Sequence, residues 1–271
     1  MSKFSTFIKY TILFSAIIFL TVVTQIGGVI LLLTYHLTGI RQPKFKGDKF
    51  IVFLILYSLF CFLVVPLVAP IFGRNAISNR KHLRPATYFT ILCNRNYVNI
   101  ELNETLEQTA DNLEGANSDI KIYYLDANFP FFDGFPLFPH LSHNDGKKID
   151  ISFVYEDKAG LIANSQKSNS GYGVFEEPKD TEINQFKKCK SAGYWQYDYS
   201  KYFTFGTKNN ELLFSEEGTK QLIMALLKSD KWGKLFIEPH LKQRLNLTDA
   251  RVRFHGCGAV RHDDHIHIQL Q

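Results

Sequence analysis

The chain has 271 residues, of which 45% are hydrophobic and 21% are charged, and this length allows one substantial domain with a smaller part beside it. Its formal net charge is +5, but six of the 31 Lys and Arg residues, against only one of the 26 acidic residues, precede residue 73. The remainder therefore carries 25 residues of each sign. A basic surface for nucleic acid is absent, and we expect no nucleic-acid partner.

The N-terminal quarter of the chain is predicted to enter a membrane. Residues 10–40 contain no Asp, Glu, Lys or Arg, and residues 50–73 form a second run without them. Each run is long enough to cross a hydrocarbon core of about 30 Å as a helix. The first is too long for the apolar part of a signal peptide, and two runs in succession favour a membrane hairpin over a buried globular helix. We expect an anchor over residues 1–74, with transmembrane helices at about 7–35 and 50–72.

Basic residues flank the predicted helices without deciding their orientation. Four lie in the loop between the helices and six lie near the other ends: Arg41, Lys44, Lys46 and Lys49 in the loop, and Lys3, Lys9, Arg74, Arg80, Lys81 and Arg84 at the ends. A hairpin places the N-terminus and the larger C-terminal part on one side of the membrane. The positive-inside count is then divided between both sides.

Residues 75–271 are predicted to form a second domain of mixed α and β structure. Strands are expected at residues 86–92, 120–125 and 149–155, which are rich in β-branched and aromatic residues. A helix is expected from Asn103 to Gly115 and another after Ser215. The strand KLFIE, a short helix that begins with a proline and the closing strand HIHIQL follow. The loop-rich residues 157–200 are expected beside a site.

Four cysteines give a weak signal about the compartment. Cys61 lies in the second apolar run, and no Cys-x-x-Cys spacing occurs, so a zinc site built from thiolates is not expected. A disulfide between Cys189 and Cys257 is one interpretation, and it would fit an oxidising compartment. Free buried thiols are the alternative.

Two segments concentrate histidine and acidic residues: PHLSHNDGKKID over residues 139–150 and RHDDHIHIQLQ over residues 261–271. In a strand, His265 and His267 would point to the same face, and Asp150 would point away from the isoleucines on either side of it. With His143 in the loop before Asp150, two imidazoles and one carboxylate could hold a catalytic zinc and leave a fourth position open. The chemistry indicated is hydrolysis by an activated water.

These residues resemble those of the penicillin-insensitive murein endopeptidases, which belong with the lysostaphin-type peptidases, the D-alanyl-D-alanine peptidases and the hedgehog-like zinc proteins. The resemblance covers roughly the C-terminal half. It is carried by HLSHNDGKKID over residues 140–150, by HDDHIH over residues 262–267 and by KLFIEPHLKQRL before them. It implies an α+β fold in which the zinc peptidase domain is built on an antiparallel sheet with flanking helices.

The resemblance also implies roles for six residues. Three match the zinc ligands: His143, Asp150 and His267. His265 matches the histidine that stabilises a developing oxyanion or transfers protons. His140 and His262 match further site histidines, which orient other groups rather than bind the metal.

The sequence departs from the family pattern in two places. Lys148 occupies the position where the family usually has a second acid, and the membrane hairpin is absent from the family's usual soluble, exported form. Neither departure removes an expected ligand. We therefore expect a change in local charge and in the route of delivery.

Several other polar residues have predicted roles that rest on weaker sequence patterns than the two motifs. Asp264 is the better candidate for orienting an imidazole, whereas Asp145 and Asp263 suit turns. Arg95 precedes the first motif at a distance where related peptidases place a clamp for the substrate carboxylate, and capping of a surface strand is its alternative. We expect His240 and His255 to be ordinary core or surface residues, and His82 to be a solvated residue that flanks the membrane.

The sequence therefore predicts a zinc metallopeptidase with Zn²⁺ as its cofactor and peptidoglycan stem peptides or cross-links as its substrate, anchored in a bacterial cytoplasmic membrane by several passes. The catalytic domain would lie on the periplasmic or extracellular side, with both termini outside. An endopeptidase is expected. A carboxypeptidase or dipeptidase acting on D-alanine-containing peptides is one alternative, and an inactive binding module stabilised by zinc is another. The sequence names no protein partner.

Overall fold

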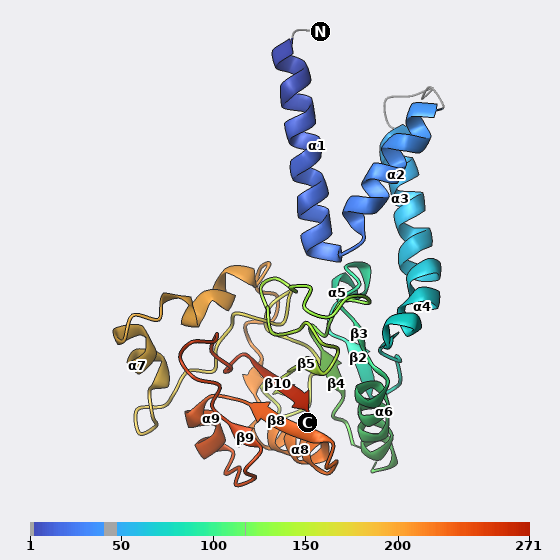
Figure 1. The fold of residues 1–271 in the computed structure, drawn as a ribbon. Coiled ribbons are helices and arrows are strands. Elements are labelled where there is room, and N and C mark those ends of the chain that lie inside the picture. The colour runs from blue at the N-terminus through green and yellow to red at the C-terminus, as the bar shows by residue number, and fades with distance from the viewer. Residues whose placement is uncertain (1–2, 41–47, 117) are drawn as a thin grey trace.

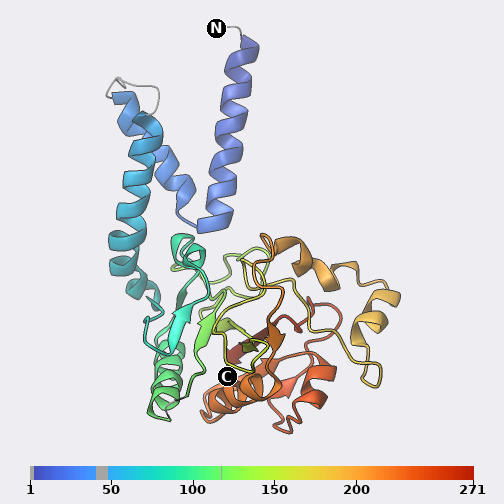
Figure 2. The same ribbon diagram turned by 180° about the vertical axis from the view of Figure 1, so that it is seen from behind.

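The computed structural model describes residues 3–40, 48–116 and 118–271, in which apolar helices stand above a mixed α and β domain (Figures 1 and 2). The helical part consists of α1 (Lys3–Thr24), α2 (Gly27–Ile40) and a longer helix made of α3 (Asp48–Leu59), η1 (Phe60–Val64), α4 (Val65–Val68) and η2 (Ala69–Phe72). Of the predicted basic loop, Arg41, Lys44 and Lys46 lie outside the described residues.

Two of these helical segments are long and apolar enough to cross a membrane, judged by length and composition. They cover residues 6–24 and 48–72, with mean hydropathies of 2.0 and 2.9, and α2 is a shorter apolar helix. Large side chains along both segments are exposed, among them Phe14 at 65% and Phe50 at 66%. Exposed apolar surface of this extent marks a region that contacts another apolar phase or partner.

The first apolar run does not form the single helix expected over residues 7–35. Gln25 has a left-handed backbone (φ 65°) between α1 and α2, and the Gly27 N–H donates to the Thr24 hydroxyl at 2.8 Å. A Cβ on Gly28 would lie 2.7 Å from the Ile17 carbonyl oxygen, so a glycine is needed for α2 to fold back beside α1. The N-terminal end of α1 consequently lies far from the domain (Figure 1), whereas a two-helix hairpin would place it on the same side as the domain.

The helices are docked onto the domain by specific hydrogen bonds. The Phe131 N–H donates to Gln25 Oε1 at 3.1 Å, the Asn94 side chain donates to the Thr24 carbonyl at 3.4 Å, and the Tyr57 hydroxyl donates to the Leu92 carbonyl at 2.6 Å. These bonds involve the break between α1 and α2 as well as α3. The helical part and the domain are therefore joined at more than one place along the chain.

The domain is built on a six-stranded sheet with the strand order β2-β4-β5-β10-β8-β9. Its strands are β2 (Leu83–Pro85), β4 (Ile122–Tyr124), β5 (Lys148–Ser152), β10 (His265–Leu270), β8 (Trp232–Phe236) and β9 (Val252–Arg253). The inner pairings are antiparallel, whereas β2 with β4 and β8 with β9 are parallel. The sheet is thus mixed and not antiparallel throughout, because a crossover containing a helix connects each parallel pair. Two small sheets pair β1 (Arg74–Ala76) with β3 (Tyr97–Asn99) and β6 (Tyr155–Glu156) with β7 (Leu213–Phe214).

Helices α6 (Ile100–Gly115) and α8 (Glu216–Leu227) pack their apolar sides against the isoleucines of β5 and β10 in one hydrophobic core. The Asn99 side chain accepts a hydrogen bond from the Leu102 N–H, so α6 begins three residues before the expected Asn103. The Ser215 side chain caps α8 in the same way, as predicted. The core thus lies on one face of the sheet and leaves the opposite face for polar groups.

The remaining helices are α5 (Tyr88–Leu92), α7 (Gln185–Ser191), η3 (Trp195–Phe203) and α9 (Pro239–Arg244). The strand predicted at residues 86–92 is wrong, because the Thr87 hydroxyl accepts from the Phe89 N–H and starts α5 there. Helix α9 begins at a proline, as expected. Helix α7 and η3 lie within or next to the segment 157–200, which is otherwise loop-rich, as predicted.

Replacement of Ile268 by alanine is expected to lower the free energy of unfolding by about 2–5 kcal/mol, because a cavity would replace a fully buried side chain in the central strand β10. The matched control is Ile183→Ala, since Ile183 is 45% exposed and its loss should change stability by less than about 0.5 kcal/mol. Urea unfolding followed by near-UV circular dichroism measures both. Equal effects of the two substitutions would contradict this placement of the core.

Candidate metal centre

The candidate site lies on the face of the sheet opposite the core, where β5 and β10 run side by side. In their antiparallel register His267 is directly opposite Asp150, and Ile266 is opposite Ile151. Because side chains alternate along a strand, Asp150, His265 and His267 share the polar face while the isoleucines enter the core. The predicted orientation of all three polar side chains is confirmed.

Three donor atoms converge at this point. His143 Nε2 lies 3.1 Å from His267 Nδ1 and 3.2 Å from Asp150 Oδ1, and the last two atoms are 2.9 Å apart. Four ligands about 2.0–2.1 Å from a tetrahedral zinc would be separated by roughly 3.3 Å. All three side chains are buried, and the group could hold a metal ion. The predicted ligand set is thus brought together from a loop and two strands.

The hydrogen bond of His143 to the backbone directs its other ring nitrogen toward the two remaining donor atoms. His143 Nδ1 is 2.7 Å from the Ala127 carbonyl oxygen, which can only accept, so Nδ1 carries a proton and Nε2 is the nitrogen that faces the other two donor atoms. Burial lowers the pKa of His267 to about 4 despite the nearby Asp150, so this imidazole is neutral at pH 7. The donor set fits a divalent metal ion such as zinc.

Asp150 is held by partners on both of its oxygens. Its Oδ2 accepts from the Tyr172 hydroxyl at 2.8 Å and lies 3.3 Å from His140 Nδ1. Burial favours the neutral acid, but His143, His265 and His140 outweigh this effect and keep the pKa of Asp150 well below its usual value. Asp150 therefore remains a carboxylate, with Oδ1 directed at the two candidate imidazole ligands.

His265 is oriented by the acid that precedes it. Its Nδ1 lies 2.5 Å from Asp264 Oδ1, and Nε2 lies 3.7 Å from Asp150 Oδ1. Asp264 is itself fixed, since its Oδ2 accepts from the Gly173 N–H at 2.6 Å and from the Ser200 hydroxyl at 3.1 Å. Burial disfavours the charged ring, but Asp150 and Asp264 outweigh it and raise the pKa of His265 to about 9. His265 is thus a proton donor beside the three ligands at neutral pH.

His140 connects the three ligands to a second buried ion pair. Its Nδ1 is 3.2 Å from Asp126 Oδ2, and Asp126 accepts from Arg95 Nε and Nη2 at 2.8 and 2.7 Å. Arg95 therefore lies near the site, as proposed from its position in the sequence, but two of its nitrogens are already bound by Asp126. It does not cap a surface strand, because only 7% of Arg95 is exposed.

A cavity of about 640 Å³ opens over the candidate ligands and is lined by all five histidines of the two motifs. The ring centroid of His262 is 4.9 Å from that of His265 and 5.6 Å from that of His267. Burial and the neighbouring His265 and His267 lower the pKa of His262 well below its usual value. His262 thus presents a neutral imidazole beside the candidate ligands.

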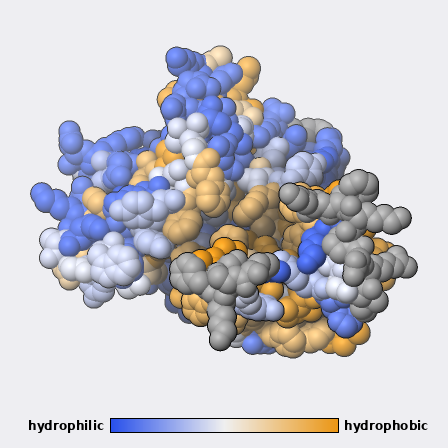
Figure 3. Space-filling view, turned by 90° about the horizontal axis from the view of Figure 1, so that it is seen from above, coloured by the Kyte–Doolittle hydropathy of each residue, from blue (hydrophilic) through white to orange (hydrophobic). Residues whose placement is uncertain are grey.

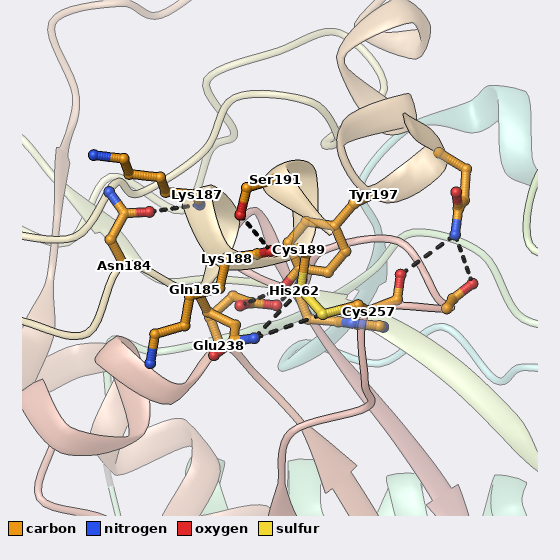
Figure 4. Close-up of a disulfide and its surroundings, with 12 residues drawn as sticks. Asn184, Gln185, Lys187, Lys188, Cys189, Ser191, Tyr197, Glu238, Cys257 and His262 are labelled. Atoms are coloured by element: carbon orange, nitrogen blue, oxygen red, sulfur yellow. Dashed lines mark hydrogen bonds between the residues drawn. A yellow bond between two sulfur atoms is a disulfide. The ribbon is translucent and has the colours of Figure 1, made fainter. Parts of the chain in front are cut away.

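A disulfide between Cys189 and Cys257 supports the loop that forms one wall of this cavity (Figure 4). It ties α7 to the segment that precedes β10, and Glu238 Oε1 accepts from the His262 N–H nearby at 3.1 Å. The structure thus selects the disulfide over free thiols for this pair, while Cys61 and Cys93 remain free. The loop that carries His262 is held covalently and by hydrogen bonds.

Two site residues were not predicted from the sequence. His255 was expected to be an ordinary residue, yet it lines the cavity and its ring is stacked on that of His267, with centroids 6.0 Å apart and planes at 14°. Tyr172 comes from the loop-rich segment and binds Asp150. Neither carries a motif signal, although the expectation that residues 157–200 lie beside a site includes Tyr172.

The other polar candidates lie away from the three ligands. Asp145 pairs with Lys148, and Asp263 pairs with Arg261. His240 is buried, with Nε2 2.8 Å from the Glu176 carbonyl oxygen, and so is a core residue as expected. His82 is 4% exposed and its Nε2 is 2.9 Å from the Ser118 carbonyl oxygen, so it is a packed residue of the domain and not a solvated one.

Comparison of the chain with models of protein families and with curated proteins finds no match.

Replacement of Asp150 by alanine is expected to weaken binding of a divalent metal by more than about 100-fold, because loss of a group that only orients a ligand already costs about 10–100-fold. Tyr172→Phe, which removes the hydrogen bond to Asp150 Oδ2, should fall in that smaller range. The exposed His36 provides the control His36→Ala, with no effect. Metal content after dialysis and titration with Zn²⁺ measure the series. Unchanged affinity in Asp150→Ala would refute the site.

The ion pair between Arg95 and Asp126 predicts that the free energy of unfolding depends on pH in the acid range. Burial would raise the pKa of Asp126, but Arg95 and then His140 outweigh it and lower this pKa from 3.8 to about 2. This carboxylate should thus contribute about 2 kcal/mol that is fully present above about pH 4 and is lost as the pH falls toward 2. The stability difference between the wild type and Asp126→Asn should shrink between pH 6 and pH 3.

Urea unfolding at each pH tests this expectation. The control is Asp180→Asn, because Asp180 is exposed and its variant should differ from the wild type equally at both pH values. A gap between the wild type and Asp126→Asn that stays constant or widens in acid would show that the carboxylate is not held ionised by Arg95.

Reduction of the disulfide is expected to lower the free energy of unfolding by about 2–4 kcal/mol, because the bond joins residues 68 apart in sequence and restricts the unfolded chain. The same reductant should leave the stability of the double variant Cys189→Ser/Cys257→Ser unchanged. Thermal unfolding with and without dithiothreitol makes the comparison. An equal response of the double variant would assign the effect to another group.

Proposed function

We propose that the chain is a zinc-dependent peptidase that hydrolyses peptidoglycan stem peptides or their cross-links, anchored in a bacterial cytoplasmic membrane. The observation that carries the proposal is the convergence of His143 Nε2, Asp150 Oδ1 and His267 Nδ1 within 2.9–3.2 Å of one another, with His265 beside them. Three protein donors leave one tetrahedral position for water or substrate, which is typical of catalytic sites and not of structural ones. The resemblance of the two motifs to murein endopeptidases supports the choice of substrate.

Zinc is the proposed ion because two neutral imidazoles and one carboxylate are a common ligand set for it in hydrolases. When bound, the ion would supply Lewis acidity, which polarises a carbonyl oxygen and makes a water molecule more acidic. Asp150, kept ionised by its neighbours, would balance part of the charge of the ion. The hydrogen bond from Tyr172 would keep Asp150 Oδ1 directed at the site.

His265 is the proposed catalytic acid. The pKa of about 9 keeps a proton on its ring at neutral pH, and Asp264 holds Nδ1 so that Nε2 points toward the candidate ligands. Nε2–H would donate to the developing oxyanion of the peptide and then deliver the proton to the leaving amine. His140 and His262 are assigned orienting roles, because His140 contacts Asp126 and Asp150 and His262 packs beside His265.

Two features support a position of the catalytic domain outside the cytoplasm. A disulfide persists in oxidising compartments and is rare in the cytosol. The first residues of α1 and α3, which include Lys3 and Lys49, lie at the helix ends away from the domain, on the side that the positive-inside rule assigns to the cytoplasm (Figure 1). On this arrangement the N-terminus is cytoplasmic, which replaces the expectation that both termini lie outside.

The surroundings of Arg95 favour an endopeptidase over a carboxypeptidase. Trimming of a terminal residue requires a cation for the free carboxylate of the substrate, and Arg95 Nε and Nη2 already bind Asp126. The oriented proton donor His265 favours an enzyme over a binding module, since metal binding alone would not require it.

His265→Ala is expected to lower kcat for muropeptide cleavage by about 100- to 1000-fold while the zinc content is retained, because one donor to the oxyanion is lost. His267→Ala should lose both zinc and activity, and His36→Ala should lose neither. The assay digests purified sacculi and cross-linked and uncross-linked muropeptides, with and without chelator. Tight zinc binding without cleavage of any wall peptide would contradict a peptidase and leave a binding module.

A further inference from the structure

A second cavity, of about 380 Å³, adjoins the cavity over the metal centre. Both are lined by Phe138, Pro139 and His140, so this short segment forms a wall between them. The second cavity is mostly apolar, and the proposed peptidase mechanism makes no use of it. Its position between the helices and the metal centre raises the question of what it binds.

One wall of the second cavity belongs to α1. Phe19 and Val23, near the C-terminal end of that helix, line it. No residue of the most apolar window of α1 is buried, and Phe19 is 64% exposed. The C-terminal end of α1 lies next to the domain (Figures 1 and 2). The cavity is lined by this end of α1 and by residues of the domain. If α1 lies in a bilayer, an apolar chain can enter the cavity along α1 without crossing water.

Exposed aromatic side chains line the cavity on the domain side or lie next to its lining residues in the chain. Phe89 of α5 and Phe205 line the cavity, are 50% and 62% exposed and pack edge to face with centroids 6.0 Å apart. Tyr88 and Tyr202 nearby in the chain are 77% and 69% exposed. Aromatic residues of this kind gather where a protein meets the membrane–water interface. In the view from above, along the helices, apolar residues gather over the helical part, and polar residues lie mostly farther out over the domain (Figure 3).

The inner end of the cavity is polar. Arg95, Asp126 and His140 line it, and His140 Nδ1 lies 3.3 Å from Asp150 Oδ2. The Thr90 hydroxyl, also in the lining, donates to the Leu125 carbonyl at 2.7 Å. The cavity thus changes from apolar at α1 to charged next to the metal centre. An amphiphile, with an apolar chain joined to a polar head, has the matching distribution of polarity.

We infer that the second cavity binds the apolar chain of a membrane lipid to which the peptide substrate is linked, and that it thereby directs the peptide head group to the metal centre. This inference rests on the proposed function and narrows it: the substrate is a peptide-bearing amphiphile in the bilayer and not the finished wall. The segment Phe138–Pro139–His140 would lie where the chain meets the head group.

Photolabelling tests the cavity independently of catalysis. The full chain is placed in nanodiscs of phosphatidylethanolamine and phosphatidylglycerol that contain a phosphatidylglycerol with a diazirine on one acyl chain, and adducts are mapped by mass spectrometry. We expect adducts at Phe203 and in the peptide with Ser170, because these residues line the cavity and, unlike Phe205, are not exposed. Adducts on the exposed face of α1 report the surrounding bilayer and serve as the reference.

A filled cavity provides the matched comparison. Val23→Trp, which places a large ring in the lining, should reduce labelling of the domain residues at least fivefold relative to the reference. Val22→Trp on the same helix should not, because Val22 is exposed and lies outside the lining. Wild-type protein without labelling between residues 169 and 205, or Val23→Trp with undiminished labelling, would overturn the inference.

Measurements of peptide cleavage test whether the second cavity serves the metal centre. A stem-type peptide joined to an isoprenyl chain and the same peptide without the chain are compared as substrates. The ratio of their kcat/KM values should fall at least tenfold in Val23→Trp and stay unchanged in Val22→Trp. Efficient cleavage of the free peptide with a ratio near one in the wild type would overturn the cavity inference and leave the peptidase. Domain labelling without cleavage of either peptide would overturn the peptidase and retain the cavity as a lipid site.

Discussion

The antiparallel pairing of β5 with β10 is the interaction on which the rest of the site depends. It places His267 opposite Asp150, although these residues are 117 positions apart in the chain. A shift of one residue in this register would send the polar side chains into the core and the isoleucines to the site. The isoleucines Ile151 and Ile266 are fully buried, so the hydrophobic energy that fixes the register also fixes the donor atoms on the opposite face.

A buried polar face of this kind is stable only when its charged groups are paired. Asp150 is fully buried, and an isolated carboxylate in that position would be strongly destabilising. Tyr172 and the imidazoles supply its partners, while Asp264 and Asp126 hold two further histidines. Much of the covering layer comes from residues 157–200. The loop-rich segment is thus required by the electrostatics of the sheet face, because it shields these ion pairs from water.

A feature could be predicted from the sequence where neighbouring residues determine it, and not where contacts between distant segments determine it. Alternation in HIHIQL and IDISFVY and the cap at Ser215 are local signals, and the orientations of Asp150 and His267 and the start of α8 followed from them. The parallel outer strands of the sheet depend on pairing between distant segments, which residue types do not encode. His255 and Tyr172 reach the site from loops, and no local pattern specifies the path of a loop.

Two predictions from the composition of a segment were wrong, because one or two residues within the segment determine a different backbone structure. Residues 86–92 have the composition of a strand, but the Thr87 cap starts a helix there. The apolar run over residues 7–35 has the composition of one helix, but Gln25 adopts a left-handed backbone, and the glycines after it allow the chain to reverse. In both cases one or two residues that form a specific backbone hydrogen bond or a close contact decide the structure, and average composition does not reveal them.

The reversal at Gln25 also determines how the anchor is attached. Gln25 Oε1 accepts from the Phe131 N–H, and Asn94 binds the Thr24 carbonyl, so the lower end of α1 is bonded to the domain and not connected through a flexible linker. A flexible linker would let the domain search the space above a membrane, since its reach grows with its length. If the apolar helices lie in a bilayer, as we propose, a docked anchor instead fixes the height of the candidate metal centre above it. On that proposal a substrate must come to the same height, which a peptide attached to a lipid would do by its own insertion in the membrane.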